Sequence, residues 1–295
     1  AATSTSAATI KLGALIYQFN DTSPSGSERE TFAAQLAIDK LNADTSAAFS
    51  GHTFELSVLE DGGSEWSAMR AACTLLREGV HAIIGPSWSS TTAHVLQITS
   101  SFAVPTISYS ATSPTIGDDT AHPYFARVPP SDALQAPAMV AVARHFDWTR
   151  TCIIYQDDTY GTNGALATRI AATRDGGVVL SMEGYDAETK DASDAITRAK
   201  ASGCRIFLHW CVECHLSMGY AHNASVLDGG NYVWILSDGC GDAIAAPDVW
   251  AHRGGISSYQ AAMVGTLCLN PSAPPGAGRA ELLNRWTAAG RTDTP

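Results

Sequence analysis

The chain has 295 residues, a formal net charge of −11 and 45% hydrophobic residues. This length is sufficient for two domains with separate cores, and the composition is that of a globular protein and not of a disordered one. The acidic balance and the absence of any Lys/Arg run argue against nucleic-acid binding, and no apolar run reaches the ~18 residues of a membrane span.

The first part of the chain alternates between strand and helix patterns. Apolar, β-branched runs bounded by turn residues predict the strands, and apolar residues at helical spacing predict the helices between them. Strands are expected at 10–17, 53–60, 80–87 and 104–110, with helices at 28–42, 65–77 and 91–102. This alternation is typical of a doubly wound parallel sheet.

A segment rich in Pro and Asp, 113–132, interrupts this alternation, which then resumes. Helices are expected at 132–146, 160–174, 189–201, 215–224 and 280–289, and extended segments at 151–158, 178–185, 204–210, 232–239 and 261–269. We therefore predict an α/β protein of two lobes, each a doubly wound parallel sheet with flanking helices, with lobe 1 at 1–128 and lobe 2 at 129–270.

Loops that follow the predicted strands carry hydroxyl groups in lobe 1. In open α/β sheets, ligands bind beyond the carboxyl ends of the strands. Ser87, Ser89 and Ser90 lie at a predicted helix N-terminus, where free N–H groups favour an anion such as a carboxylate. Ser110 and Thr112 follow the next strand. Because no Gly-rich nucleotide motif is present, dinucleotide chemistry is not expected.

The corresponding loops of lobe 2 carry groups that suit a cation. Asp132 and Asp238 supply carboxylates, and Tyr160 opens a predicted helix with an aromatic ring. An anion site on one lobe and a cation site on the other would hold an α-amino acid. Taken singly, a Ser or Asp at such a position is more often an N-cap or turn residue than a ligand contact.

Two glycosylation sequons, which begin at Asn20 and Asn223, favour an oxidising compartment over the cytosol. The chain also has seven cysteines, so at least one of them has no partner inside the chain. Residues 1–9 lack the features of a signal peptide, so we expect any targeting segment to have been removed or to lie outside this chain.

Three segments carry a resemblance to a known family: "IIGPSWSSTTAHVLQITSSFAVPTISYSATSP", "HPYFARVPPSDALQAPAMVAVARHFDWT" and "YQDDTYGTNG". Together they resemble the extracellular ligand-binding domain of class C G-protein-coupled receptors, with the metabotropic glutamate and GABA-B receptors nearest. The likeness covers about residues 10–290. It implies a type I periplasmic-binding-protein fold, a two-lobed clamp that closes on its ligand, and a homo- or heterodimer through lobe 1. It also implies that 271–295 begins a return segment to lobe 1 within a longer ectodomain, attached to the membrane only by segments outside this chain.

The resemblance also assigns roles to individual residues. Ser89 would hold the ligand carboxylate, Ser110 and Thr112 would contact the ligand backbone, and an acidic and aromatic set would hold the ammonium group, namely Asp132, Tyr160 and Asp238. Trp66 corresponds to a tryptophan that packs on the ligand, and Glu213 to a cleft-facing acid.

Departures from the family pattern bear on the ligand. Trp88 stands where the glutamate receptors have a small residue, so the pocket is expected to be narrower. The loop 17–26 lacks an Arg or Lys to bind a second carboxylate, which would then be desolvated without a partner. We therefore expect a neutral or amine-bearing amino acid and not glutamate. Cys73 resembles a helix cysteine whose partner in related domains would lie beyond residue 295.

Cys211-Val-Glu-Cys214-His215 reads as a c-type haem attachment motif. It follows the strand 204–210, however, and Cys240 ends the next parallel strand, so a disulfide from Cys211 or Cys214 to Cys240 is geometrically reasonable. Structural cysteines are preferred over a local metal or redox role, and both over haem. No cofactor is expected.

Three classes of function can be distinguished for this chain. The preferred one is an extracellular small-molecule sensing domain of a cell-surface receptor. The alternative is an extracellular architectural or adhesion domain that keeps the fold without a ligand. An enzyme is not expected, because no nucleophile–base pair and no metal cluster can be identified in the sequence.

Overall fold

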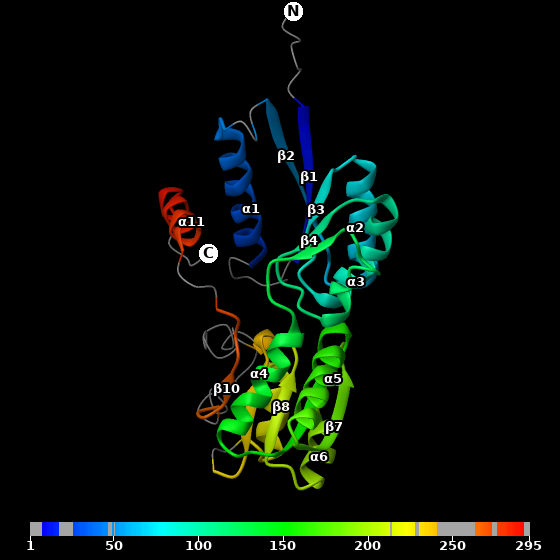
Figure 1. Ribbon diagram of the computed structural model, residues 1–295, viewed down its shortest axis with the longest axis vertical. Helices are drawn as coiled ribbons and strands as arrows, with labels where there is room; N and C mark the ends of the chain where they lie inside the picture. Colours follow the sequence, from blue (N-terminus) through cyan, green and yellow to red (C-terminus); the bar gives the residue numbers. More distant parts are fainter. Residues whose placement is uncertain are drawn as a thin grey trace, which may run out of the picture. The chain divides into compact units, whose positions relative to one another are not determined.

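Two five-stranded parallel sheets, each flanked by helices, make up the computed structural model (Figure 1). The structure describes residues 8–17, 26–46, 49, 51–212, 214–227, 230–240, 263–272 and 276–291. The chain divides into unit 1, which comprises Ala1–Ala111, Ile116–Pro129 and Ser272–Pro295, and unit 2, which comprises Thr112–Thr115 and Pro130–Pro271. The predicted fold class is confirmed.

Unit 1 contains a sheet in the order β2-β1-β3-β4-β5. Leu15, Leu75, Ile83 and Val95 are fully buried and form its core. The strands and helices are β1 Ala8–Ile16, α1 Gly26–Ala43, β2 His52–Glu60, α2 Glu65–Arg77, β3 Ala82–Ile84, α3 Ser89–Thr99, β4 Thr106–Ser108, β5 Phe125–Arg127 and α11 Ala277–Ala288.

Helix α11 belongs to unit 1, although it follows unit 2 in the sequence. α11 lies beside α1 (Figure 1), where Trp286 packs edge-on against Phe32 at 5.1 Å between ring centroids. A Lys40–Glu281 ion pair of 2.6 Å joins the same two helices. Trp286 is only 2% exposed. The contact with Phe32 therefore joins α1 and α11, which are far apart in the sequence, through buried apolar surface.

Unit 2 contains a sheet in the order β10-β9-β8-β6-β7. Its centre is aromatic: Phe207 stacks on Trp234 at 4.5 Å, and Trp210 is fully buried. The elements are α4 Asp132–His145, β6 Arg150–Asp157, α5 Thr159–Arg174, β7 Val178–Asp186, α6 Ser193–Ala201, β8 Ile206–Trp210, α7 His215–Asn223, β9 Val233–Leu236, the 3₁₀ helix η3 Asp238–Cys240 and β10 Leu267–Cys268.

A disulfide that was not anticipated from the sequence links Cys152 in β6 to Cys204, just before β8. Both cysteines are buried, and their Cα atoms are 6.1 Å apart. β6 and β8 are hydrogen-bonded neighbours in the sheet, which explains why residues 52 positions apart in the chain meet.

One predicted helix begins later than expected. α6 starts at Ser193 and not at 189, because Asp186 accepts hydrogen bonds from the backbone N–H groups of Glu188 and Thr189. Lys190 then adopts a left-handed φ of 55°, which is incompatible with a helix at that point. The local turn chemistry of Asp overrides the helical pattern here.

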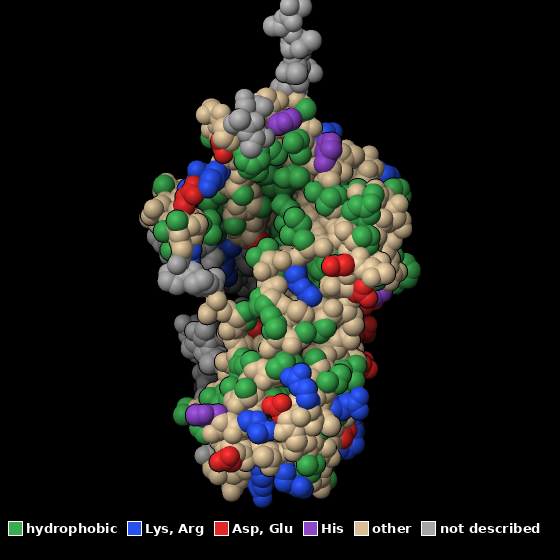
Figure 2. All heavy atoms as spheres, viewed as in Figure 1, with side chains coloured by type: hydrophobic (Ala, Val, Ile, Leu, Met, Phe, Trp, Pro, Cys, Tyr) green, Lys and Arg blue, Asp and Glu red, His purple; other side chains and the backbone are tan. Residues whose placement is uncertain are grey.

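Charged side chains of both signs are interspersed over unit 2 on the face shown in Figure 2. An example is the 2.6 Å ion pair between Arg198 and Glu183. No helix within the described part of the chain has both the length and the apolar character needed to cross a membrane.

Candidate functional site

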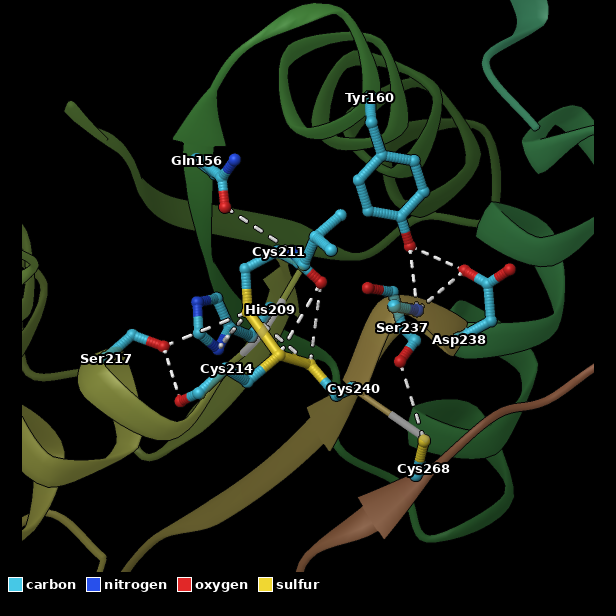
Figure 3. The surroundings of a disulfide bond; sticks show 12 residues. Gln156, Tyr160, His209, Cys211, Cys214, Ser217, Ser237, Asp238, Cys240 and Cys268 are labelled. Atoms are coloured by element: carbon cyan, nitrogen blue, oxygen red, sulfur yellow. Dashed lines mark hydrogen bonds between the residues drawn. A yellow bond between two sulfur atoms is a disulfide. The ribbon is translucent and has the colours of Figure 1, made fainter. Parts of the chain in front are cut away.

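Three predicted lobe-2 residues meet at the carboxyl edge of the unit 2 sheet. The Tyr160 hydroxyl donates a 2.5 Å hydrogen bond to Asp238 Oδ1 (Figure 3). The charge of Asp132 lies close enough to affect the same phenol. Thr112 joins this group through its carbonyl, which accepts a 2.9 Å hydrogen bond from the Asp132 N–H.

Local sequence chemistry positions Tyr160 at the first turn of α5. Asp158 caps this helix by accepting a 2.7 Å hydrogen bond from the Gly161 N–H. A Cβ at Gly161 would lie 2.1 Å from the Gln156 carbonyl oxygen, so only glycine allows this approach. Trp210 packs edge-on against the Tyr160 ring at 5.6 Å and fixes its direction.

The electrostatics of this group favour a bound cation. Burial raises the pKa of Tyr160 well above its usual value, and the charges of Asp238 and Asp132 raise it further, so the phenol stays protonated and donates. Two carboxylates then stand beside one neutral hydroxyl. An ammonium group placed there would offset the repulsion between the two carboxylates, because its positive charge would be attracted to both.

The predicted lobe-1 residues lie around the carboxyl edge of the other sheet. Trp88 precedes α3 and packs on Tyr17 with ring centroids 4.3 Å apart. Ser89 is buried as the first residue of α3, whereas Ser110 is exposed after β4. Trp66, at the start of α2, is 80% exposed, which leaves an indole available at the surface of unit 1.

Sequence reasoning missed an acidic group at this same edge. Asp61 follows β2 and is 1% exposed; its Oδ1 accepts a 2.9 Å hydrogen bond from the Gly63 N–H, and its Oδ2 has no hydrogen-bond partner. Glu30 in α1 accepts a 3.1 Å hydrogen bond from the Tyr109 hydroxyl. Burial is the main reason that the pKa of each carboxyl group is raised, and the charge of Asp61 raises that of Glu30 further.

Asp61→Asn is expected to stabilise unit 1 at neutral pH. Because the folded-state pKa of Asp61 is raised, the folded protein binds its proton more tightly, and the free energy of unfolding falls as pH rises above the unfolded value near 4. Asn keeps the acceptor for Gly63 and removes the charge, so the gain at pH 7 is roughly 1 kcal/mol. Urea unfolding at pH 5 and pH 7 measures this, and an unchanged pH slope in the variant would contradict it.

The three cysteines singled out in the sequence come together (Figure 3). The Cys214 sulfur lies at bonding distance from the sulfurs of both Cys211 and Cys240, although it can form a disulfide with only one of them at a time. His209 lies beside them, and burial lowers the pKa of its imidazole to about 3, so the ring is neutral. Cys211 and Cys214 are buried, so neither sulfur is open to a haem group.

The remaining predicted residues are dispersed. Glu213 and Asn20 lie outside the described residues. Asn223 is exposed at the end of α7, as a glycosylation site requires. Cys73 is exposed on α2 and is free in the structure.

Comparison with known proteins assigns the chain to a family. Residues 29–295 match the model of the family described as "Receptor family ligand binding region". The chain belongs to this receptor family. Its two parallel α/β sheets are those of a periplasmic-binding-protein-like fold, and neither the family nor the relatives are enzymes.

Individual relatives of this receptor-family chain are metabotropic glutamate receptors and a receptor-like protein. Metabotropic glutamate receptor 4 of Macaca fascicularis is 28% identical over 70% of the chain and 24% of the receptor. Metabotropic glutamate receptor-like protein E of Dictyostelium discoideum is 25% identical over 73% of the chain and 27% of that protein. Metabotropic glutamate receptor 6 of Mus musculus is 33% identical over 52% of the chain and 17% of the receptor. The matched part of the chain thus spans between 17% and 27% of the length of these relatives.

Proposed function

We propose that this ligand-binding region is the extracellular sensing domain of a cell-surface receptor and closes on a neutral or amine-bearing amino acid. The observation that carries the proposal is the Tyr160–Asp238 pair with Asp132 beside it. These groups form a cation site at the carboxyl edge of a sheet, where ligands of α/β proteins bind. The α-ammonium group of an amino acid is the cation that fits it.

The opposite end of the ligand would be held by unit 1. Ser89 opens α3, so its hydroxyl and the first N–H groups of that helix offer a carboxylate the favourable end of a helix dipole. Ser110 and Thr112 would add contacts along the ligand backbone, and Trp66, Trp88 and Glu213 would line its side chain. Clamp closure follows when the ligand binds the closed form more tightly than the open one.

The charge at the edge of unit 1 supports the choice of ligand class. Asp61 and Glu30 are acidic, and the pKa values of both are raised by burial. A second ligand carboxylate near them would be repelled and desolvated, whereas an amine would be attracted. This supports the expectation that glutamate is not the ligand. Pairing of lobe 1 with another receptor chain remains a prediction from the resemblance.

Calorimetric titration of the purified chain with the twenty amino acids, GABA and simple amines tests the proposal. Saturable binding is expected for at least one neutral or amine-bearing amino acid, with glutamate at least about 100-fold weaker, since like charges brought together cost several kcal/mol. Lysine and norleucine form a matched pair of ligands. They differ by the terminal amine, so the ratio of their Kd values measures what a side-chain ammonium group contributes to binding. Glutamate as the tightest ligand would contradict the ligand class, and silence from folded protein would favour an architectural domain instead.

A further inference from the structure

Four buried donor atoms converge in unit 2 beside the candidate ligand site (Figure 3). The sulfurs of Cys211 and Cys240 are 3.4 Å apart, and the Cys214 sulfur contacts both. His209 Nδ1 lies 3.8 Å from the Cys211 sulfur. The donor atoms of His209, Cys211 and Cys214 all lie within 4.8 Å of one another, and all four residues are at most 1% exposed.

Disulfide chemistry alone does not account for this group. Cys214 can pair with Cys211 or with Cys240, and either pairing leaves one buried thiol beside the Nδ1 atom of a buried imidazole. A metal ion uses all four donors around a single point. We propose that Cys211, Cys214, Cys240 and His209 form a tetrahedral site for a thiophilic divalent cation, of which Zn²⁺ is the type. The ion would bind as the chain folds, while the three cysteines are still thiols, and would hold them as thiolates in place of a disulfide.

The donor set matches the coordination chemistry of zinc. Structural zinc sites are closed and tetrahedral, Cys₃His is one of their ligand sets, and two of the cysteines are often separated by two residues, as Cys211 and Cys214 are. Binding would replace the three thiol protons, which pass to solvent, and would transfer no electrons. The imidazole contributes as a neutral ligand, so its binding requires no loss of a proton.

Neighbouring residues supply the outer contacts that such ligands need. With Nδ1 on the metal, the ring carries its proton on Nε2 and donates it to the Tyr185 hydroxyl oxygen, 3.2 Å away. This contact fixes both the tautomer and the orientation of the ring. The Ser217 hydroxyl lies 3.8 Å from the Cys211 sulfur, where it can donate to a thiolate.

The test uses the whole chain, purified anaerobically with a phosphine reductant and supplied with Zn²⁺ or with Co²⁺ as a spectroscopic probe. One tightly held zinc ion per chain is expected by elemental analysis. Co²⁺ is expected to give the visible and charge-transfer bands of a tetrahedral thiolate complex. Tyr185→Phe should keep the stoichiometry and weaken Zn²⁺ binding by about 10- to 100-fold.

Substitutions separate this site from other thiols. Cys214→Ser and Cys240→Ser are expected to lose the tetrahedral Co²⁺ spectrum, whereas Cys73→Ser, which removes the exposed thiol of α2, should retain it. Metal binding by the unsubstituted protein tests the proposed site even if a variant fails to fold. Folded, reduced wild-type chain that shows no tetrahedral thiolate spectrum and holds no stoichiometric zinc would overturn the proposal.

Discussion

Asp238→Ala is expected to abolish measurable amino-acid binding while leaving the chain folded. Asp238 is partly exposed and holds the Tyr160 hydroxyl at 2.5 Å, so its loss removes the proposed partner of the ligand ammonium and releases the phenol. The bound ligand would cover Asp238 and pair it with the ammonium group, and truncating one member of a buried charge pair costs about 2–5 kcal/mol, or roughly 30- to several-thousand-fold in Kd. Calorimetry with the amino acids that bind the wild-type chain measures the loss.

Two variants make this result interpretable. Asp175→Ala removes an exposed aspartate at the end of α5, far along the helix from Tyr160, and should leave Kd unchanged. Asp238→Asn keeps the shape and an acceptor for Tyr160 but removes the charge, so it should bind as poorly as the Ala variant if the charge matters. Near-normal binding by Asp238→Asn would show that Asp238 acts by positioning Tyr160 alone.

Removing the Cys152–Cys204 disulfide is expected to give the largest loss of stability in unit 2. The bond closes a loop between residues 52 positions apart, and the chain-entropy model assigns about 4 kcal/mol to a loop of that length. Replacing both cysteines with Ala keeps the buried sites small and apolar. Urea unfolding, with hydrogen exchange of β6 and β8 identifying which unit opens, measures the change.

The matched control for the double substitution is Cys73→Ser, because Cys73 is exposed and lies in unit 1. Its stability is expected to stay within about 0.5 kcal/mol of wild type. If the double Ala variant lost less than about 1 kcal/mol, the disulfide would not constrain the unfolded chain as proposed. A selective loss of protection in β6 and β8, with unit 1 unaffected, would support the assignment.

The architecture could be predicted from the sequence because strand and helix patterns alternate regularly. The helix expected at 65–77 is α2 as observed, and the strand expected at 178–185 is β7. The Cys152–Cys204 bond could not be predicted, since it depends on β8 lying beside β6 and not beside β7. Chain order alone does not reveal which strands become neighbours in a doubly wound sheet.

The candidate site residues also fall into two groups, those that the sequence indicates and those that only the structure reveals. Tyr160, Asp132 and Asp238 could be grouped from the sequence because each lies near a strand end, and the fold brings such positions together. Asp61 stands directly after β2 and had the same positional signal, but its burial and its lack of a second hydrogen-bond partner appear only in three dimensions. The charge character of a pocket depends on which acids lose their water, and sequence spacing does not report that.

The contact between Phe32 and Trp286 has a consequence for how the protein is made. Apart from four residues, unit 2 is one continuous stretch of chain, so during synthesis it can fold as soon as residue 271 has left the ribosome. The side of α1 that carries Phe32 must instead wait for α11, about 250 residues later. For the whole of that interval α1 is a nascent segment with an uncovered aromatic surface, which is where a chaperone would be expected to bind.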